Sequence, residues 1–206
     1  PAGPIYKFVW RGKSFEKGPK MDFPKKTNIF GLALADVRNK GTLDVVTLNE
    51  SEQLRIQSAD GKVTWTSKVL FGGTNNFYDM KGKREPGPNP KDALNLRVDV
   101  PGRILIKDLD GDGMNELIIN ANHATTSLFR TGRTRSFGSG EIYDSIWEDG
   151  NLATLWKTRE IDGYIADYQV KDVDNDGDEE LAVAVVDFGG VTDRKGTSTI
   201  LFFKLF

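Results

Sequence analysis

The sequence predicts an all-β fold in which short antiparallel strands recur in groups of four. Glycine accounts for 22 of the 206 residues, and Asp-Gly pairs of the kind that close tight turns separate the apolar runs. Those runs have the length of strands. None approaches the roughly 18 residues that a membrane-spanning helix needs, so we expect no transmembrane segment. The chain also repeats itself, and the repeats group the strands.

The composition excludes several classes of partner and site. Hydrophobic residues make up 38% of the chain, charged residues 28%, and the formal net charge is -2, as in ordinary globular proteins. We therefore expect no binding to nucleic acid. Cysteine is absent, which excludes disulfides and cysteine-based zinc sites. The sequence starts at Pro1 without a methionine, which favours a processed or trimmed product and is compatible with the loss of a signal segment.

The repeated element is a strand, an acidic loop and a second strand. Its three copies are Gly31–Glu50, Arg103–Asn122 and Asp167–Val186. The loops within them, residues 36–44, 108–116 and 172–180, are called the first, second and third acidic loops. Each loop opens and closes with an acidic residue and leads into an apolar run, so each copy predicts two paired strands.

A predicted hairpin alternates with this element. The segments "IYKFVWRGKSFEKG", "LRIQSADGKVTWTSK" and "EIYDSIWEDGNLATLWKTRE" each have the pattern of strand, turn and strand, with Gly12, Gly61 and Gly150 at the turns. Asp60-Gly61 and Asp149-Gly150 are strong hairpin signals, because two-residue turns of this type need a positive φ. The repeating unit is therefore four antiparallel strands, which is the description of a β-propeller blade. A generic β-sandwich is the alternative.

The second and third acidic loops carry the oxygen ligands of a hard cation. Ca²⁺ takes about six to eight oxygens, which carboxylates at loop positions one, three, five and nine and a backbone carbonyl at position seven would largely supply. A glycine at position six allows the sharp turn between them. The candidate ligands are Asp108, Asp110, Asp112, Met114 and Glu116 in the second loop, and Asp172, Asp174, Asp176, Asp178 and Glu180 in the third. We expect two Ca²⁺ sites.

An EF-hand or a magnesium site fits these two loops less well. An EF-hand needs an acid at position twelve and flanking helices, but position twelve is Ile119 or Val183, and the flanks have strand-like sequences. Mg²⁺ usually keeps several waters and does not select so dense a set of carboxylates. A solvated acidic turn is the remaining alternative.

The first acidic loop departs from the pattern. It retains Asp36, Gly41 and Asp44 but has Arg38 and Lys40 at positions three and five. We expect one of these two cations to replace the metal by pairing with the acids, so that the site is lost while the loop shape persists.

The segments "DLDGDGMNEL" and "DVDNDGDEEL" resemble the calcium loops of FG-GAP (VCBS-type) repeats. Those repeats form the blades of β-propellers, including the head of integrin α-subunits. The resemblance covers most of the chain, with the motif intact in two copies and degenerate in the first. It implies calcium on a blade loop and an extracellular, periplasmic or cell-surface location, but no particular ligand.

On this basis the chain divides into one hairpin and three blades. Residues 5–18 form the hairpin of a preceding blade, 29–70 a blade with the degenerate loop, and 102–160 and 164–206 two blades with calcium loops. This is a partial propeller of about three to three and a half blades, whereas ring closure typically takes four to eight. We therefore expect an upstream segment or another chain to complete the ring and to cover the apolar strand 201–206.

We favour a module for binding or adhesion, or a structural part of a larger assembly, over an enzyme. Its partner would be a protein or a carbohydrate. Trp10, Trp65, Trp147 and Trp156 could stack on sugars, although core packing is the more common use of such aromatics. The basic segments 81–92 and 130–135 could bind an anion, but solvated surface loops usually look like this.

The alternative is an enzyme that processes acidic polysaccharides, because some FG-GAP-like propellers belong to polysaccharide lyases. His123, which has no evident partner in the sequence, and Arg130, Arg133 and Arg135 would be its candidate residues.

Overall fold

The computed structural model describes residues 4–23, 27–58, 60–80, 96–125, 137–187 and 196–205. These residues form antiparallel sheets and one short 3₁₀ turn, η1 (Ile29–Gly31), so the predicted all-β class is confirmed. The described part of the chain has no helix long and apolar enough to cross a membrane. The basic segments 81–92 and 130–135 lie outside the described residues.

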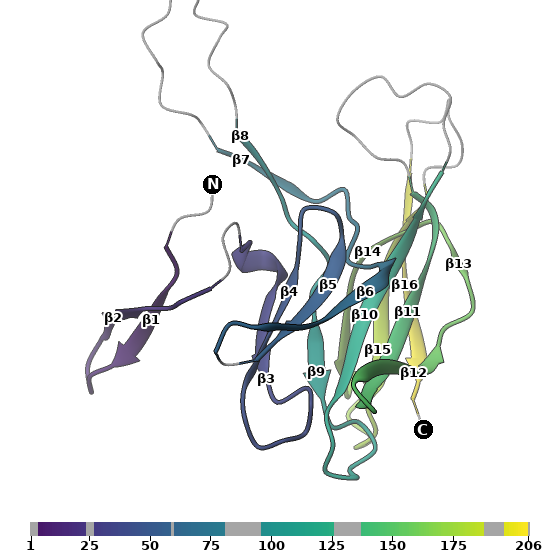
Figure 1. The fold of residues 1–206 in the computed structure, drawn as a ribbon. Helices are drawn as coiled ribbons and strands as arrows, with labels where there is room; N and C mark the ends of the chain where they lie inside the picture. The colour runs from purple at the N-terminus through teal and green to yellow at the C-terminus, as the bar shows by residue number, and fades with distance from the viewer. Residues whose placement is uncertain are drawn as a thin grey trace, which may run out of the picture.

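Three sheets, each a meander of consecutive strands, stand side by side (Figure 1). The first sheet contains β3 (Leu32–Ala35), β4 (Asp44–Leu48), β5 (Gln53–Gln57) and β6 (Val63–Leu70). The central sheet contains β9 (Leu105–Lys107), β10 (Glu116–Ala124), β11 (Phe137–Glu148) and β12 (Asn151–Lys157), with β13 (Ile161–Asp162) paired to β11. The third sheet contains β14 (Tyr164–Lys171), β15 (Glu180–Asp187) and β16 (Thr197–Lys204).

Two hairpins lie outside these sheets. The N-terminal one pairs β1 (Tyr6–Trp10) with β2 (Phe15–Lys20) and stands apart from the three sheets (Figure 1). The other pairs β7 (Phe77–Met80) with β8 (Leu96–Asp99). Residues 72–95 are rich in Gly, Pro, Asn and Lys, a composition that predicts a long loop, and this prediction is wrong at residues 77–80, which form a strand. Phe77 and Tyr78 favour strands, and they pair with a segment beyond the Gly- and Pro-rich stretch.

The central strand β10 is buried on both faces, and this decides how the sheets stack. Its side chains alternate, so that Leu117 and Ile119 pack towards the first sheet and Ile118 packs towards the third. The first core contains Val37, Val46, Leu48, Leu54, Ile56, Phe71, Leu117, Ile119 and Ala121. The second core contains Ile118, Ile142, Ile161, Ile165, Tyr168, Val170, Leu181, Val183 and Val185. Two apolar layers thus hold the three sheets face to face.

Polar contacts join the sheets beside these cores. The Gly72 amide donates to the Asn120 carbonyl at 2.7 Å, which ties the end of the first sheet to β10. The side-chain nitrogen of Asn122, Nδ2, donates to the backbone carbonyls of Gly73 (2.7 Å) and Ile165 (2.9 Å). Because Ile165 lies on β14, these contacts of β10 reach elements on both sides of the central sheet.

The tryptophans mostly serve packing. Trp65 and Trp147 lie against the first core and Trp156 against the second. The Trp65 indole also donates to the Asn151 side chain at 2.7 Å, linking the first and central sheets. Trp10 differs, because it is 56% exposed on the N-terminal hairpin.

The last strand divides its apolar residues between two faces. On β16 and just beyond it, Leu201, Phe203 and Leu205 pack against the second core, whereas Ile200 and Phe202 are exposed. One face of this strand is therefore covered by the chain's own second core and the other is exposed, while cover by an upstream segment or another chain stays a prediction.

Gly72→Ala should destabilise the fold more than Gly61→Ala does. Both glycines have positive φ (+69° and +81°), so either alanine loses about 1–2 kcal/mol to the backbone. A Cβ on Gly72 would lie 2.3 Å from Leu48 Cδ1 in the first core, whereas a Cβ on Gly61 meets nothing within 4 Å. We expect Gly72→Ala to cost about 1–3 kcal/mol more in urea unfolding. An equal loss of unfolding free energy in both variants would mean that the Leu48 side chain moves aside without cost.

Candidate metal centres in the acidic loops

All three acidic loops share one hydrogen-bond frame. The first carboxylate accepts from the glycine amide at position six: Gly41 to Asp36, Gly113 to Asp108 at 3.0 Å, and Gly177 to Asp172 at 3.1 Å. The last acid accepts from an amide near the start: Arg38 to Asp44 at 3.1 Å, Leu109 to Glu116 at 2.6 Å, and Val173 to Glu180 at 3.0 Å. The loops therefore keep one shape although their side chains differ.

Two positions in each loop take a left-handed backbone. Position six is glycine throughout, as the predicted sharp turn requires, with φ of +73°, +90° and +99°. Position four is Asn39, Gly111 or Asn175, also with positive φ. This second requirement was not predicted from the sequence. The available signal was the use of only Asn or Gly there, the residues that tolerate this conformation best.

The second loop gathers four carboxylates. Oxygens of Asp108, Asp110, Asp112 and Glu116 all lie within 4.8 Å of one another, which is the spacing of oxygens about 2.3–2.6 Å from one shared cation. Glu116 is 2% exposed, and its Oε1 has no hydrogen-bond partner. Burial raises the pKa of Glu116, and the charges of Asp110 and Asp108 add to the rise. This cluster could hold a metal ion.

Met114, the remaining predicted ligand of the second loop, is placed for a backbone role. Its amide donates to Asp112 Oδ1 at 2.7 Å, and its side chain is exposed. A thioether would be a poor ligand for a hard cation, so only the Met114 carbonyl could contribute.

The third loop gathers three carboxylates. Oxygens of Asp172, Asp174 and Asp176 lie within 4.8 Å of one another, and Asp172 Oδ1 is buried without a partner. Glu180 is outside this group, with one oxygen held by the Val173 amide. The Asp178 carboxylate turns to Lys204, 2.8 Å away, which leaves Asp178 to act through its backbone carbonyl. This second cluster could also hold a metal ion.

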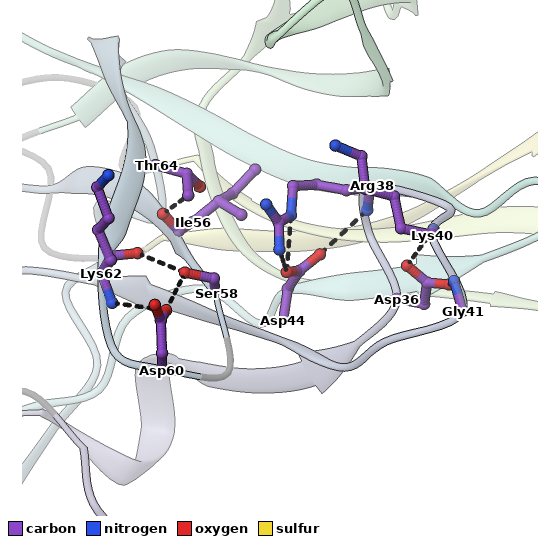
Figure 2. A network of polar contacts seen from close by, with 10 residues as sticks. All are labelled: Asp36, Arg38, Lys40, Gly41, Asp44, Ile56, Ser58, Asp60, Lys62 and Thr64. Carbon is purple, nitrogen blue, oxygen red and sulfur yellow. Dashed lines mark hydrogen bonds and ion pairs between the residues drawn. The ribbon is translucent and has the colours of Figure 1, made fainter.

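In the first loop a guanidinium occupies the place of a cation (Figure 2). Arg38 Nε donates to Asp44 Oδ1 at 2.8 Å, and the terminal nitrogen of Arg38 lies 2.6 Å from the same oxygen. Asp44 is fully buried. The oxygens of Asp36 accept from the amides of Lys40 and Gly41. The expected replacement is therefore present for Asp44, with Arg38 as the cation, whereas Asp36 is satisfied by backbone amides.

Neighbouring loops touch one another at the lower end of the sheets in Figure 1. The Asn115 side chain in the second loop donates to the Asp36 carbonyl at 3.0 Å, and its amide donates to Asn39 Oδ1 at 2.8 Å. Lys107, just before the second loop, pairs with Glu179 in the third. A change in the conformation of one loop can therefore affect the loop of the neighbouring sheet through these contacts.

A buried aspartate from outside the loops adjoins the second loop. Asp144 on β11 pairs with Ile118, so it lies diagonally from Glu116 on the same face of the central sheet. It is 2% exposed, and its Oδ1 has no partner. Burial, followed by the charge of Glu116, raises the pKa of Asp144 to about 7. Nothing in the sequence singled out this residue.

A separate polar cluster surrounds Glu141 near the far end of β10. Glu141 Oε1 lies 2.6 Å from Lys157 Nζ, and Oε2 lies 3.1 Å from the Tyr143 hydroxyl and 3.2 Å from His123 Nε2. The expectation that His123 lacks a partner is therefore wrong. The antiparallel pairing of β10 and β11 brings a carboxylate to it from 18 residues away. The three predicted arginines at 130, 133 and 135 lie outside the described residues.

No protein-family model matches this chain, and no curated protein sequence gives a significant match. The likeness to FG-GAP repeats rests on the loops themselves.

Arg38→Ala should strongly destabilise the fold, because it leaves the fully buried Asp44 without its cation. Removing one partner of a buried pair costs about 3–5 kcal/mol. Lys40→Ala is the matched control, since the exposed Lys40 side chain is in the same loop and only its backbone amide contacts Asp36. Urea unfolding should show a large loss for the first variant and almost none for the second. The reverse order would contradict the assignment of Arg38.

Glu141→Gln should weaken the fold at neutral pH and not at low pH. The hydrogen bond from Lys157, helped by Tyr143 and His123, lowers the pKa of Glu141. A carboxylate with a lowered pKa stabilises the fold at pH values above the ordinary glutamate pKa of about 4.3. This stabilisation is lost as the pH falls through the pKa of the folded state. The gap in melting temperature from wild type should thus close below about pH 4. Exposed Glu148→Gln on the same strand is the control, and a pH-independent gap for Glu141→Gln would contradict the assignment.

Proposed function

We propose that this chain is a calcium-binding β-propeller module of the FG-GAP (VCBS) type that serves binding or adhesion outside the cytosol. The observation that carries the proposal is a difference between the loops. The second and third loops each contain a buried carboxylate oxygen without a partner, Glu116 Oε1 and Asp172 Oδ1. In the first loop all four oxygens of Asp36 and Asp44 accept hydrogen bonds.

An unpartnered buried carboxylate oxygen is costly, and among the three loops it occurs only in the two that lack an internal arginine. A bound cation removes that cost by taking the free oxygens as ligands. The donor set is carboxylate and carbonyl oxygen alone, which suits Ca²⁺ or Mg²⁺ and not zinc or copper. The density of carboxylates favours Ca²⁺, because Mg²⁺ keeps most of its waters.

The calcium ions would be structural. Each proposed site closes the loop between the first two strands of its sheet, and contacts of Asn115 and Lys107 join neighbouring loops across the sheets. Neutralising the carboxylates would therefore stabilise both the loop and its contact with the neighbouring sheet. We assign the three meander sheets to propeller blades, which present loops at both ends for recognition of a protein or carbohydrate.

The location follows from the affinity expected of such loops. Extracellular calcium modules bind at about 10⁻⁴–10⁻³ M, so only a calcium-rich compartment would fill them. This supports an extracellular, periplasmic or cell-surface protein.

Calcium titration by calorimetry should give a stoichiometry of about two. Asp110→Ala and Asp174→Ala should each remove one site, because each deletes a central ligand, whereas Asp36→Ala should leave both. At a calcium concentration about a hundredfold above Kd, each site adds about 2.7 kcal/mol of stability, so chelator should lower the melting temperature. A stoichiometry of three, or melting that ignores chelator, would contradict the proposal.

A second candidate function is proton transfer on an acidic polysaccharide. The cluster around Glu141 supports it, since a carboxylate that holds His123 Nε2 leaves Nδ1 of the ring as a base, with Tyr143 and Lys157 beside it. In such a reaction the base removes a proton next to the sugar carboxylate and a C=C bond forms, while the C–O bond to the leaving sugar breaks and its oxygen takes the electron pair and a proton from water. The test is ultraviolet detection of unsaturated product from uronic-acid polymers. Turnover lost in His123→Ala would establish this function, and no turnover would exclude it for the polymers used.

A further inference from the structure

Two buried carboxylates of the central sheet have free oxygens on the same face. Glu116 ends the second acidic loop, and Asp144 lies diagonally across from it on β11. Each is 2% exposed, and Glu116 Oε1 and Asp144 Oδ1 have no hydrogen-bond partner. Two buried carboxylates side by side repel one another unless positive charge lies near both.

The other two sheets have no acid at this place. Asp144 pairs with Ile118, which follows the closing acid Glu116 by two residues. The equivalent position in each other sheet is the residue that pairs with the one two residues after that loop's closing acid. In the first sheet Ile56 pairs with Val46, and in the third sheet Phe202 pairs with Ala182. The fifth carboxylate is therefore particular to the central sheet and is not part of the repeated motif.

Lysines also distinguish the two metal loops. Lys204 lies 2.8 Å from Asp178 and 3.8 Å from Asp176, and Lys107 pairs with Glu179, so two ammonium groups offset the charge of the third loop. Within the described ranges, no lysine or arginine contacts Asp144 or a carboxylate of the second loop. The second loop therefore has one more acid nearby than the third, and Lys107, whose backbone pairs with Glu116, directs its ammonium group to the third loop.

We propose that Asp144 is a fifth carboxylate of the second loop's cation site and makes it the tighter of the chain's two calcium sites. This inference rests on the proposed calcium binding. Asp144 acts from behind Glu116: it adds negative charge close to the ion while the loop supplies the direct ligands. Calcium affinity rises with the number of carboxylates at a site, so the second loop fills first and the third loop fills at higher calcium.

The same placement predicts a cost without calcium. In the calcium-free chain the charges of Asp144 and Glu116 lie on the same face of the sheet with no cation to offset them, so Asp144 destabilises that state. A purely structural aspartate would do the opposite, because its loss would weaken the fold whether calcium is present or not.

Calorimetry on the full chain separates the sites. Asp174→Ala leaves the second-loop site, and Asp110→Ala leaves the third-loop site. Adding Asp144→Asn should weaken calcium binding about tenfold in the Asp174→Ala background, in the range found for residues behind metal ligands. It should leave binding in the Asp110→Ala background unchanged. Glu148→Gln, which removes an exposed charge from the same strand, is the matched control and should change neither.

Thermal melting in chelator supplies a readout independent of binding. Asp144→Asn should melt at the same or a higher temperature than wild type without calcium, and should show a smaller rise when calcium is added. Unchanged affinity in the Asp174→Ala background, or a lower melting temperature in chelator, would overturn this inference and leave the proposed function standing. Absence of calcium binding by the wild-type chain would overturn both.

Discussion

Neutralisation of converging carboxylates is the constraint on which each sheet of this protein depends. The strands on either side of an acidic loop can pair only if the loop closes, and closing it brings its first and last acids into a partly buried space. In all three loops the amide at position six donates to the first acid, and the last acid accepts from an amide at position three in the first loop and at position two in the others. The loops differ in the carboxylate oxygens that no backbone amide contacts. In the first loop the Arg38 guanidinium binds that oxygen, whereas the second and third loops each keep a buried carboxylate oxygen without a partner. The same local problem is thus solved by a side chain in one repeat and, on our proposal, by a metal ion in the other two.

The stack of sheets makes the loops interdependent. Because β10 is buried on both faces, the central sheet belongs to both apolar cores, and its loop touches the loops on either side through Asn115 and Lys107. A cation in the second loop would therefore act on a strand that both neighbouring sheets pack against. The side-chain amides of Asn120 and Asn122 fix the opposite half of the same strand to neighbouring elements.

The sequence was most informative where chemistry is local. The spacing of acids and glycines within nine residues predicted the acidic loops, and the same positions predicted that Arg38 or Lys40 replaces the metal in the first loop; only the structure shows that the cation is Arg38. The sequence did not predict side-chain contacts that depend on the register in which two strands pair. Asp144 lies near Glu116, and Glu141 near His123, only because β10 and β11 pair in one particular register, which residue spacing within the sequence does not specify. The β7–β8 pairing has the same origin, since its strands flank a segment whose composition suggested only a loop.

Crystals of the chain grown with calcium, examined by anomalous diffraction, test the central claim most directly. We expect one anomalous peak within the second acidic loop and one within the third, each about 2.3–2.6 Å from its carboxylate oxygens. We also expect the Arg38 guanidinium to stay on Asp44, with no peak in the first loop. A peak in the first loop, or none in the second and third, would contradict the claim that each loop needs one compensating cation and that Arg38 already supplies it in the first.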